Sequence, residues 1–318
     1  MTRTEQTGPD TGPLHAQPSA VWVIGNHHAG LRDALVAIEA CGMVVARVMS
    51  VADAIAALDD FPTANTIIAE IGLDLSDPVK VLLGVLSERA RNTRQSIIVS
   101  CQMPALDLVV AAIASLDVTL LCDADVADRI AALSVGLGYL TRMDESDRTA
   151  DALRLLRLTD EVSRIARALA DITIGNGDTR PHNLSEGLTG YRAGPAETTG
   201  QAATITVDEI RLIIRWRRRR EALFDGALFA DPAWDIMLDL AASRLSQADV
   251  SVSSLCIAAA VPATTALRWI KTLTEAGIIN RIADPDDGRR VFMQLSDVAA
   301  DKVLDYLGRA KNAGVWQF

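Results

Sequence analysis

The 318-residue chain lacks any apolar run long enough to cross a membrane. No stretch approaches the roughly 18 uninterrupted apolar residues that a transmembrane helix requires. Residues 1–19 are polar and rich in Pro, Gly and Thr, without the apolar segment of a secretory signal. We therefore expect a cytoplasmic protein with no membrane partner and a disordered leader over residues 1–19.

Cysteine and histidine are scarce, and their spacing matches no metal-binding motif. The four cysteines lie far apart without a CxxC pair, and only four histidines accompany them. We interpret the thiols as reduced core residues and expect no metal and no cofactor. Because no Ser/His/Asp or Cys/His arrangement is visible either, an enzyme is not expected. The cysteines are Cys41, Cys101, Cys122 and Cys256.

An excess of basic residues is also missing, since the formal net charge is −10. Residues 1–204 contain 16 Lys and Arg against 26 Asp and Glu, whereas residues 205–318 contain 15 of each. The whole negative charge therefore belongs to the N-terminal part, which we expect to stay clear of nucleic acid. Six arginines crowd residues 211–220, and a solvated helix face or a surface that faces phosphate would each explain them.

Residues 20–140 alternate short β-rich runs with helix-length amphipathic stretches. This pattern predicts an α/β domain with a parallel, doubly wound sheet and a flavodoxin-like strand order. Ser50 is expected to cap the second helix, and Asp77 with Pro78 to open the third. The expected strands are 20–24, 43–48, 66–70, 96–100 and 118–122.

This domain resembles the receiver domains of response regulators, but it departs from their phosphorylation motif. That family carries paired acids after strand 1, an Asp at the end of strand 3, a Ser or Thr after strand 4 and a Lys after strand 5. The chain has Gly25 and Asn26, Glu70, Ser100, and Cys122 followed by Asp. Without the acid pair and the Lys, no phosphorylation is expected. Glu70 stands at the degenerate phosphoacceptor position, either as a fixed charge in a locked scaffold or as a surface residue without a role.

Residues 146–172 carry an apolar seam with alternating spacings of three and four residues. The seam predicts a short coiled-coil helix that contributes to a homodimer, although one more core helix of the first domain would also fit. Residues 175–204 contain six glycines and few apolar residues, which indicates a flexible linker. The seam residues are Leu155, Leu158, Val162, Ile165, Leu169 and Ile172.

Residues 205–318 predict a winged helix-turn-helix domain, mainly helical with a β-hairpin wing. Two helices flank a tight turn at Val261 and Pro262, and a strand–turn–strand with an Asp-Gly pair follows. On the helix that begins at Ala263, the apolar residues share one face and the polar residues lie opposite, so we expect one face to dock and the other to be free. The residues expected to contact DNA are Ser253, Thr264, Thr265, Arg268, Lys271, Thr272, Arg289 and Arg290.

This domain resembles the MarR-type winged-helix regulators. Their wing has the form DPxDxR before a strand ending in Leu-Thr, and the chain matches it with Asp284, Pro285, Asp287, Arg289, Leu295 and Ser296. The resemblance implies that Asp287 structures the wing and that Arg289 inserts it into DNA. It also implies a homodimer through helices near 206–224, with Ile210 and Ile214, and near 296–313, bound to palindromic duplex DNA.

The sequence therefore predicts a homodimeric, sequence-specific DNA-binding transcriptional regulator that acts without aspartyl phosphorylation. The alternative is a signalling receiver or adaptor that responds to a ligand or partner and whose winged helix serves protein contacts. An unidentified small-molecule or protein effector would fit either interpretation.

Overall fold

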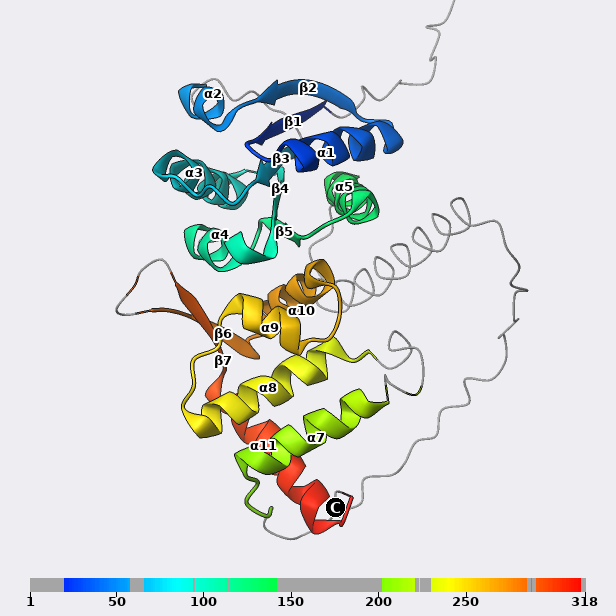
Figure 1. Cartoon of the computed structure of the whole chain (residues 1–318), viewed down its shortest axis with the longest axis vertical. Coiled ribbons are helices and arrows are strands. Elements are labelled where there is room, and N and C mark those ends of the chain that lie inside the picture. Colours follow the sequence, from blue (N-terminus) through cyan, green and yellow to red (C-terminus); the bar gives the residue numbers. More distant parts are fainter. Residues whose placement is uncertain are drawn as a thin grey trace, which may run out of the picture.

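A computed structural model provides the structure of the chain (Figure 1). It describes residues 20–57, 66–93, 95–113, 115–141, 202–220, 223, 230–284, 287 and 290–315. The predicted leader, the seam from Leu155 to Ile172, nearly all of the linker and Arg289 lie outside the described residues.

The N-terminal part contains a five-stranded parallel sheet in the order β2-β1-β3-β4-β5. This confirms the predicted parallel α/β sheet, and the order is compatible with a flavodoxin-like domain. The central strands are mostly apolar because helices cover both faces of the sheet, and their polar residues lie near the strand ends. The strands are β1 (Ala20–Gly25), β2 (Val44–Met49), β3 (Thr66–Ile71), β4 (Ser96–Cys101) and β5 (Thr119–Cys122).

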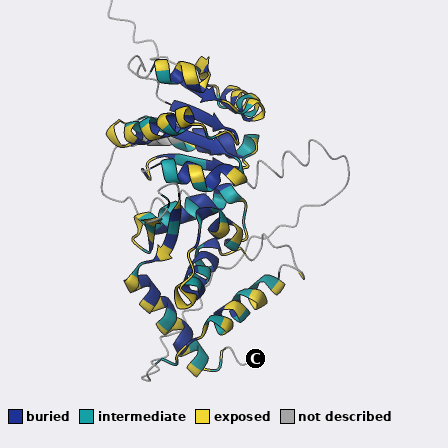
Figure 2. Cartoon of the chain, turned by 60° about the vertical axis from the view of Figure 1, so that its left-hand side comes forward, coloured by how far each residue is buried: buried dark blue, intermediate teal, exposed yellow. Residues whose placement is uncertain are grey.

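Two layers of helices sandwich this sheet. Helices α1 and α5 pack on one face, where Val23, Ile38 and Leu133 join one apolar cluster. Helices α2, α3 and α4 pack on the other face (Figure 1). The strands between the two layers are buried (Figure 2). The bounds are α1 (His28–Ala40), α2 (Val51–Ala56), α3 (Asp77–Asn92), α4 (Leu106–Ala112) and α5 (Val126–Thr141).

The C-terminal part is helical with one two-stranded antiparallel hairpin. Among the described residues, no single helix is long and apolar enough to cross a membrane. The elements are α7 (Val207–Arg219), α8 (Pro232–Ser246), α9 (Val252–Ala258), α10 (Ala263–Glu275), β6 (Ile279–Ala283), β7 (Val291–Leu295) and α11 (Asp297–Asn312).

Local capping explains where several helices begin. The Thr206 hydroxyl accepts from the Glu209 amide and the Glu209 carboxylate accepts from the Thr206 amide, which completes a capping box at α7. Ser50 caps α2 as predicted, because its hydroxyl accepts from the Asp53 amide. The predicted cap at Asp77 is wrong by one residue: Ser76 precedes α3, and Asp77 and Pro78 lie in its first turn.

The two parts of the chain touch each other. Helix α10 packs against β5, and helix α9 packs against α4 (Figure 1). One apolar cluster of buried side chains includes residues from both parts, among them Val110, Leu255 and Leu267. The acidic N-terminal part, which we expected to stay clear of nucleic acid, therefore lies against the neutral C-terminal part.

Candidate nucleic-acid interface

Helices α9 and α10 form a sharply bent pair that a hairpin follows. Their axes differ by 108°, within the range of roughly 90–120° that is typical of helix-turn-helix units. Ala260 adopts a left-handed conformation, with φ of 53°, in the turn between them. Gly277 ends α10 with φ of +68°, a backbone conformation that favours glycine.

One face of α10 packs in the core, as the spacing predicts. Ala266, Leu267, Ile270 and Leu273 are buried there. The opposite face was expected to be free, but Thr264 is only 1% exposed. Thr265, Arg268, Lys271 and Thr272 are partly buried, and both terminal nitrogens of Arg268 are shielded from solvent. At Thr264 the cover is the N-terminal domain, because β5 packs against α10 and Cys122 hydrogen-bonds the Thr264 hydroxyl.

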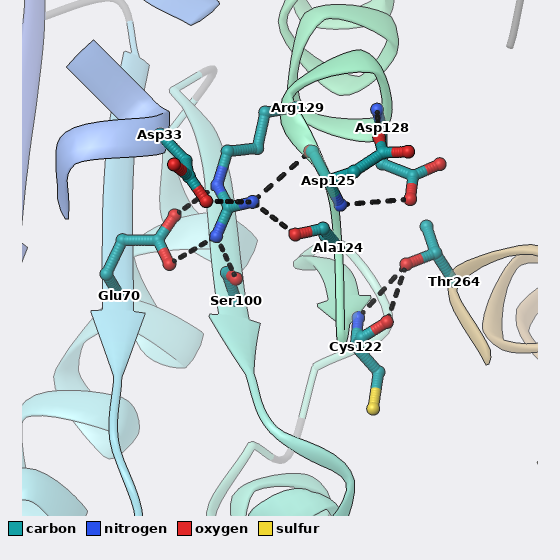
Figure 3. Close-up of polar contacts among 9 residues, drawn as sticks. All are labelled: Asp33, Glu70, Ser100, Cys122, Ala124, Asp125, Asp128, Arg129 and Thr264. Carbon is teal, nitrogen blue, oxygen red and sulfur yellow. Dashed lines mark hydrogen bonds and ion pairs between the residues drawn. The ribbon is translucent and has the colours of Figure 1, made fainter. Parts of the chain in front are cut away.

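Two hydroxyls predicted to contact DNA are occupied by groups of the N-terminal domain. The Thr264 hydroxyl donates to the Cys122 carbonyl and accepts from the Cys122 amide, each at 3.1 Å (Figure 3). The Ser253 amide donates to Asp107 Oδ1 at 2.9 Å, and the Ser253 hydroxyl donates to Asp107 Oδ2 at 2.5 Å. Both hydroxyls therefore have protein partners where the sequence analysis expected phosphate or base edges.

Two cations of the C-terminal domain are partly buried near the N-terminal domain. Burial lowers the pKa of Lys271, and the charges of Glu275 and Asp117 oppose that effect. Asp117 belongs to the N-terminal domain, so its charge reaches Lys271 across the contact between the domains. Arg281 donates to the Val110 carbonyl of α4, and burial lowers its pKa as well.

The hairpin tip keeps polar side chains near solvent. The Asp287 amide donates to Asp284 Oδ1 at 3.2 Å, and the Arg290 amide donates to the Asp287 carbonyl at 2.9 Å. Asp287 thus orders the tip through its backbone, in line with the wing-structuring role that the resemblance implies. Arg290 is exposed, and its Nε lies 3.9 Å from the Asp287 carboxylate.

The arginine run on α7 divides into structural and exposed members. Arg217 Nε donates to Asp235 Oδ1 at 2.9 Å, and Arg218 donates to the Ala258 carbonyl at 2.7 Å. Arg219 lies over the Trp216 ring, with 4.6 Å to the ring centroid. Arg211 and Arg215 are exposed. A solvated face and a phosphate-facing surface both remain compatible with the exposed members.

The predicted dimer residues on α7 pack within the chain. Ile210 is buried, and Ile214 is partly buried against the same apolar cluster. Helix α11 packs on α8, where Trp234 and Tyr306 meet edge to face at 5.3 Å. Tyr306 is exposed on its other side, at 55%. Dimerisation through α7 and α11 stays a prediction.

Glu70 is not a surface residue, because it lies in a buried ion pair at the carboxyl end of β3. Glu70 Oε1 accepts from Arg129 Nε, and Glu70 Oε2 accepts from an Arg129 terminal nitrogen, both at 2.8 Å (Figure 3). The two side chains are 0% and 4% exposed. Such a two-pronged pair fixes both the position and the orientation of the carboxylate.

Arg129 also connects this pair to neighbouring strands and loops. It donates to the Ser100 hydroxyl at 3.2 Å, to the Ala124 carbonyl at 2.5 Å and to the Asp125 carbonyl at 3.2 Å. Burial alone would lower the pKa of Arg129, but hydrogen bonds to Glu70 and nearby negative charges raise it. The guanidinium therefore stays charged and holds the loop that follows β5.

Asn26, at another receiver-like position, binds two backbone groups of the loop after β3. Asn26 Oδ1 accepts from the Gly72 amide at 2.7 Å, and Asn26 Nδ2 donates to the Asp74 carbonyl at 3.1 Å. A Cβ at Gly30 would lie 2.2 Å from Glu70 Oε2, so helix α1 passes close to the carboxylate only because residue 30 is glycine. In the described part of the chain, no group of three or more His, Cys, Asp or Glu side chains could hold a metal ion.

Sequence reasoning missed Arg129 as a functional residue. The signal was present, because Arg129 is the single basic residue between Arg94 and Arg142. A carboxylate that packs against the helix after the fifth strand therefore has Arg129 as the one basic residue of that helix to pair with. It was missed because the receiver pattern directs attention to a lysine directly after the fifth strand, whereas Arg129 lies in the first turn of α5.

Comparisons with protein-family models, with curated proteins and with solved structures gave no match for this chain.

Proposed function

We propose that the protein is a homodimeric transcriptional regulator that binds specific sequences of duplex DNA through a winged helix-turn-helix in its C-terminal part. The observation that carries the proposal is the α9–α10 pair, bent by 108° and followed by an antiparallel hairpin with Arg290 at its tip. A helix presented in this way fits the major groove, and the hairpin lies where a wing would reach the neighbouring backbone.

The polar face of α10 supplies suitable chemistry for reading base pairs. Arg268 can donate two hydrogen bonds to guanine, and Thr265 can contact a thymine methyl or a phosphate. Lys271 lies one helical turn further along and can neutralise a phosphate. The proposal places the protein in the cytoplasm.

The test is selection from a pool of random duplexes with the full chain, followed by affinity measurements at two salt concentrations. We expect enrichment of a motif with two-fold symmetry. We also expect an affinity that falls steeply as salt rises, because phosphate contacts release counterions. A selected pool no richer in any motif than the starting pool would contradict sequence-specific binding.

The proposed regulator works without aspartyl phosphorylation. In the phosphoacceptor-like position, both Glu70 oxygens accept hydrogen bonds from Arg129, and Asn26 replaces an acid that would bind Mg²⁺. We therefore expect that acetyl phosphate with Mg²⁺ leaves the intact mass of the protein unchanged, and that beryllofluoride leaves its DNA affinity unchanged. An acyl phosphate on residues 20–140 would contradict this part of the proposal.

One observation favours the second candidate, an adaptor whose helical unit serves protein contacts. Helices α9 and α10 already bind protein in this structure, namely Asp107 and Cys122 of the same chain. The salt titration separates the two candidates, since an adaptor of this kind would show no duplex binding even at low salt.

A further inference from the structure

We propose that the N-terminal domain holds the protein closed by covering the DNA-reading face of α10, so that duplex DNA binds only after the two domains separate. This inference rests on the proposed DNA-binding function and names its regulation. It assigns a regulatory role to the N-terminal domain, for which no phosphorylation is expected. The contact surface consists of α4, the end of β5 and the loop between them on one side, and α9, α10 and β6 on the other.

The covering contacts engage the groups that the proposed function needs for DNA. Thr264 exchanges two hydrogen bonds with the backbone of Cys122, and Ser253 gives two to the Asp107 carboxylate. A carboxylate is an oxygen acceptor with negative charge, as a phosphate is, so Asp107 satisfies the same donors that a DNA backbone would. In the closed state, these donors therefore already have hydrogen-bond acceptors from the N-terminal domain.

The N-terminal domain and duplex DNA cannot occupy the α10 face at the same time. Thr264 is only 1% exposed, so no base edge or phosphate can reach it while Cys122 is in place. The N-terminal part up to residue 204 also carries an excess of ten acidic over basic residues, 26 against 16. DNA that approached the closed protein would meet this negative charge as well as a covered helix.

The contact between the two domains has a polar part and an apolar part. Its described hydrogen bonds join three residue pairs, and Val110, Leu255 and Leu267 belong to an apolar cluster that both domains share. Contacts between domains of one chain commonly resemble transient protein interfaces, so we expect this one to open. Burial lowers the pKa of both Lys271 and Arg281, two cations on the C-terminal side of the contact that duplex phosphates would stabilise. If the closed state dominates, the apparent DNA affinity equals the affinity of the open protein multiplied by the fraction of protein that is open.

The structure links the closed contact to the buried ion pair. Arg129 holds the carbonyls of Ala124 and Asp125, two and three residues after Cys122, while Cys122 holds Thr264 (Figure 3). The Glu70–Arg129 pair therefore supports the loop that presents Cys122 to α10. Any effector that loosened this loop would also loosen the cover.

The test changes Asp107 in the full chain, because Asp107 belongs to the cover and not to the DNA-reading unit. Asp107→Ala removes both acceptors of Ser253, and Asp107→Lys also places a positive charge against its donors. Glu39→Ala and Glu39→Lys make the same charge changes at an exposed position of α1, on the opposite face of the sheet. For each protein, amide hydrogen exchange of the α9 and α10 segments reports opening, and fluorescence anisotropy with a duplex of 30 random base pairs at low salt reports binding.

We expect the Ser253 amide to exchange faster in both Asp107 variants than in the wild type. We expect duplex affinity to rise by about tenfold in Asp107→Ala. The rise should be larger still in Asp107→Lys, and it should exceed the rise in Glu39→Lys. Faster exchange with unchanged affinity would overturn the closed-state proposal while leaving DNA binding intact. Exchange and affinity that both match the Glu39 controls would overturn it too. If none of the proteins bound duplex even though the Asp107 variants opened, the proposed function itself would fall, and the regulatory inference with it.

Discussion

Replacing Arg129 with Met is expected to lower the free energy of unfolding of the N-terminal domain by about 3–5 kcal/mol. The reason is that Glu70 would keep its carboxylate in a site where it is 0% exposed, without the cation that now neutralises it. The Ala124 and Asp125 carbonyls would lose their donor in the same step. Urea unfolding combined with hydrogen exchange of the β3 and β4 amides measures this loss in the domain where it arises.

A paired substitution shows whether the charge or the packing is responsible. Glu70→Leu together with Arg129→Met removes both charges and keeps apolar volume, so we expect the double variant to recover most of the lost stability. Arg309→Met removes an exposed arginine that pairs with Asp305 on α11, and we expect no change in the unfolding midpoint from it. An Arg129→Met protein as stable as the wild type would contradict a stabilising role of the buried Glu70–Arg129 ion pair.

The elements that a periodic pattern determines could be predicted from the sequence. The five strands, the capping box at Thr206, the end of α10 at Gly277 and the core face of α10 all depend on residues close together in the chain. Local spacing sets which face of a helix is apolar, and local side chains satisfy the first amides of a helix. These features follow from short-range chemistry that a single sequence displays.

The covered face of α10 could not be predicted in the same way. Thr264 and Cys122 are 142 positions apart, and their hydrogen bonds arise only when two folded domains meet. A threonine on the polar side of an amphipathic helix predicts exposure, whether or not another domain later covers it. Charge arithmetic gave no warning of this contact, because it predicts that DNA repels an acidic domain and says nothing about that domain's contact with a neutral one.

The role of Glu70 was open for a related reason. A glutamate at the end of a strand is compatible with a solvent-exposed tip, and only the position of Arg129 on α5 decides that it is buried. The pairing joins residues 59 positions apart. Comparison with the receiver pattern correctly indicated the missing acid pair, but it gave no information about an arginine that the pattern does not contain.

Arg268→Ala is expected to weaken binding to the selected duplex by about 1–3 kcal/mol, which corresponds to a loss of roughly 5- to 150-fold in affinity. The reason is that a bidentate arginine–guanine contact exists only with the correct base pair. Binding to a scrambled duplex depends on phosphate contacts and should change little. Because Arg268 also lies within the contact between the domains, the change must be measured in the wild-type chain and in the Asp107→Ala background.

The most direct test of the central claim, that α10 reads DNA, is this measurement made by fluorescence anisotropy with the selected and the scrambled duplex. Arg309→Ala serves as the control, since it removes one positive charge from an exposed position on α11. The account predicts that Arg268→Ala loses affinity for the selected duplex alone and that Arg309→Ala leaves the ratio of the two affinities unchanged. An equal loss on both duplexes, or no loss on either, would contradict the assignment of α10 as the reading helix.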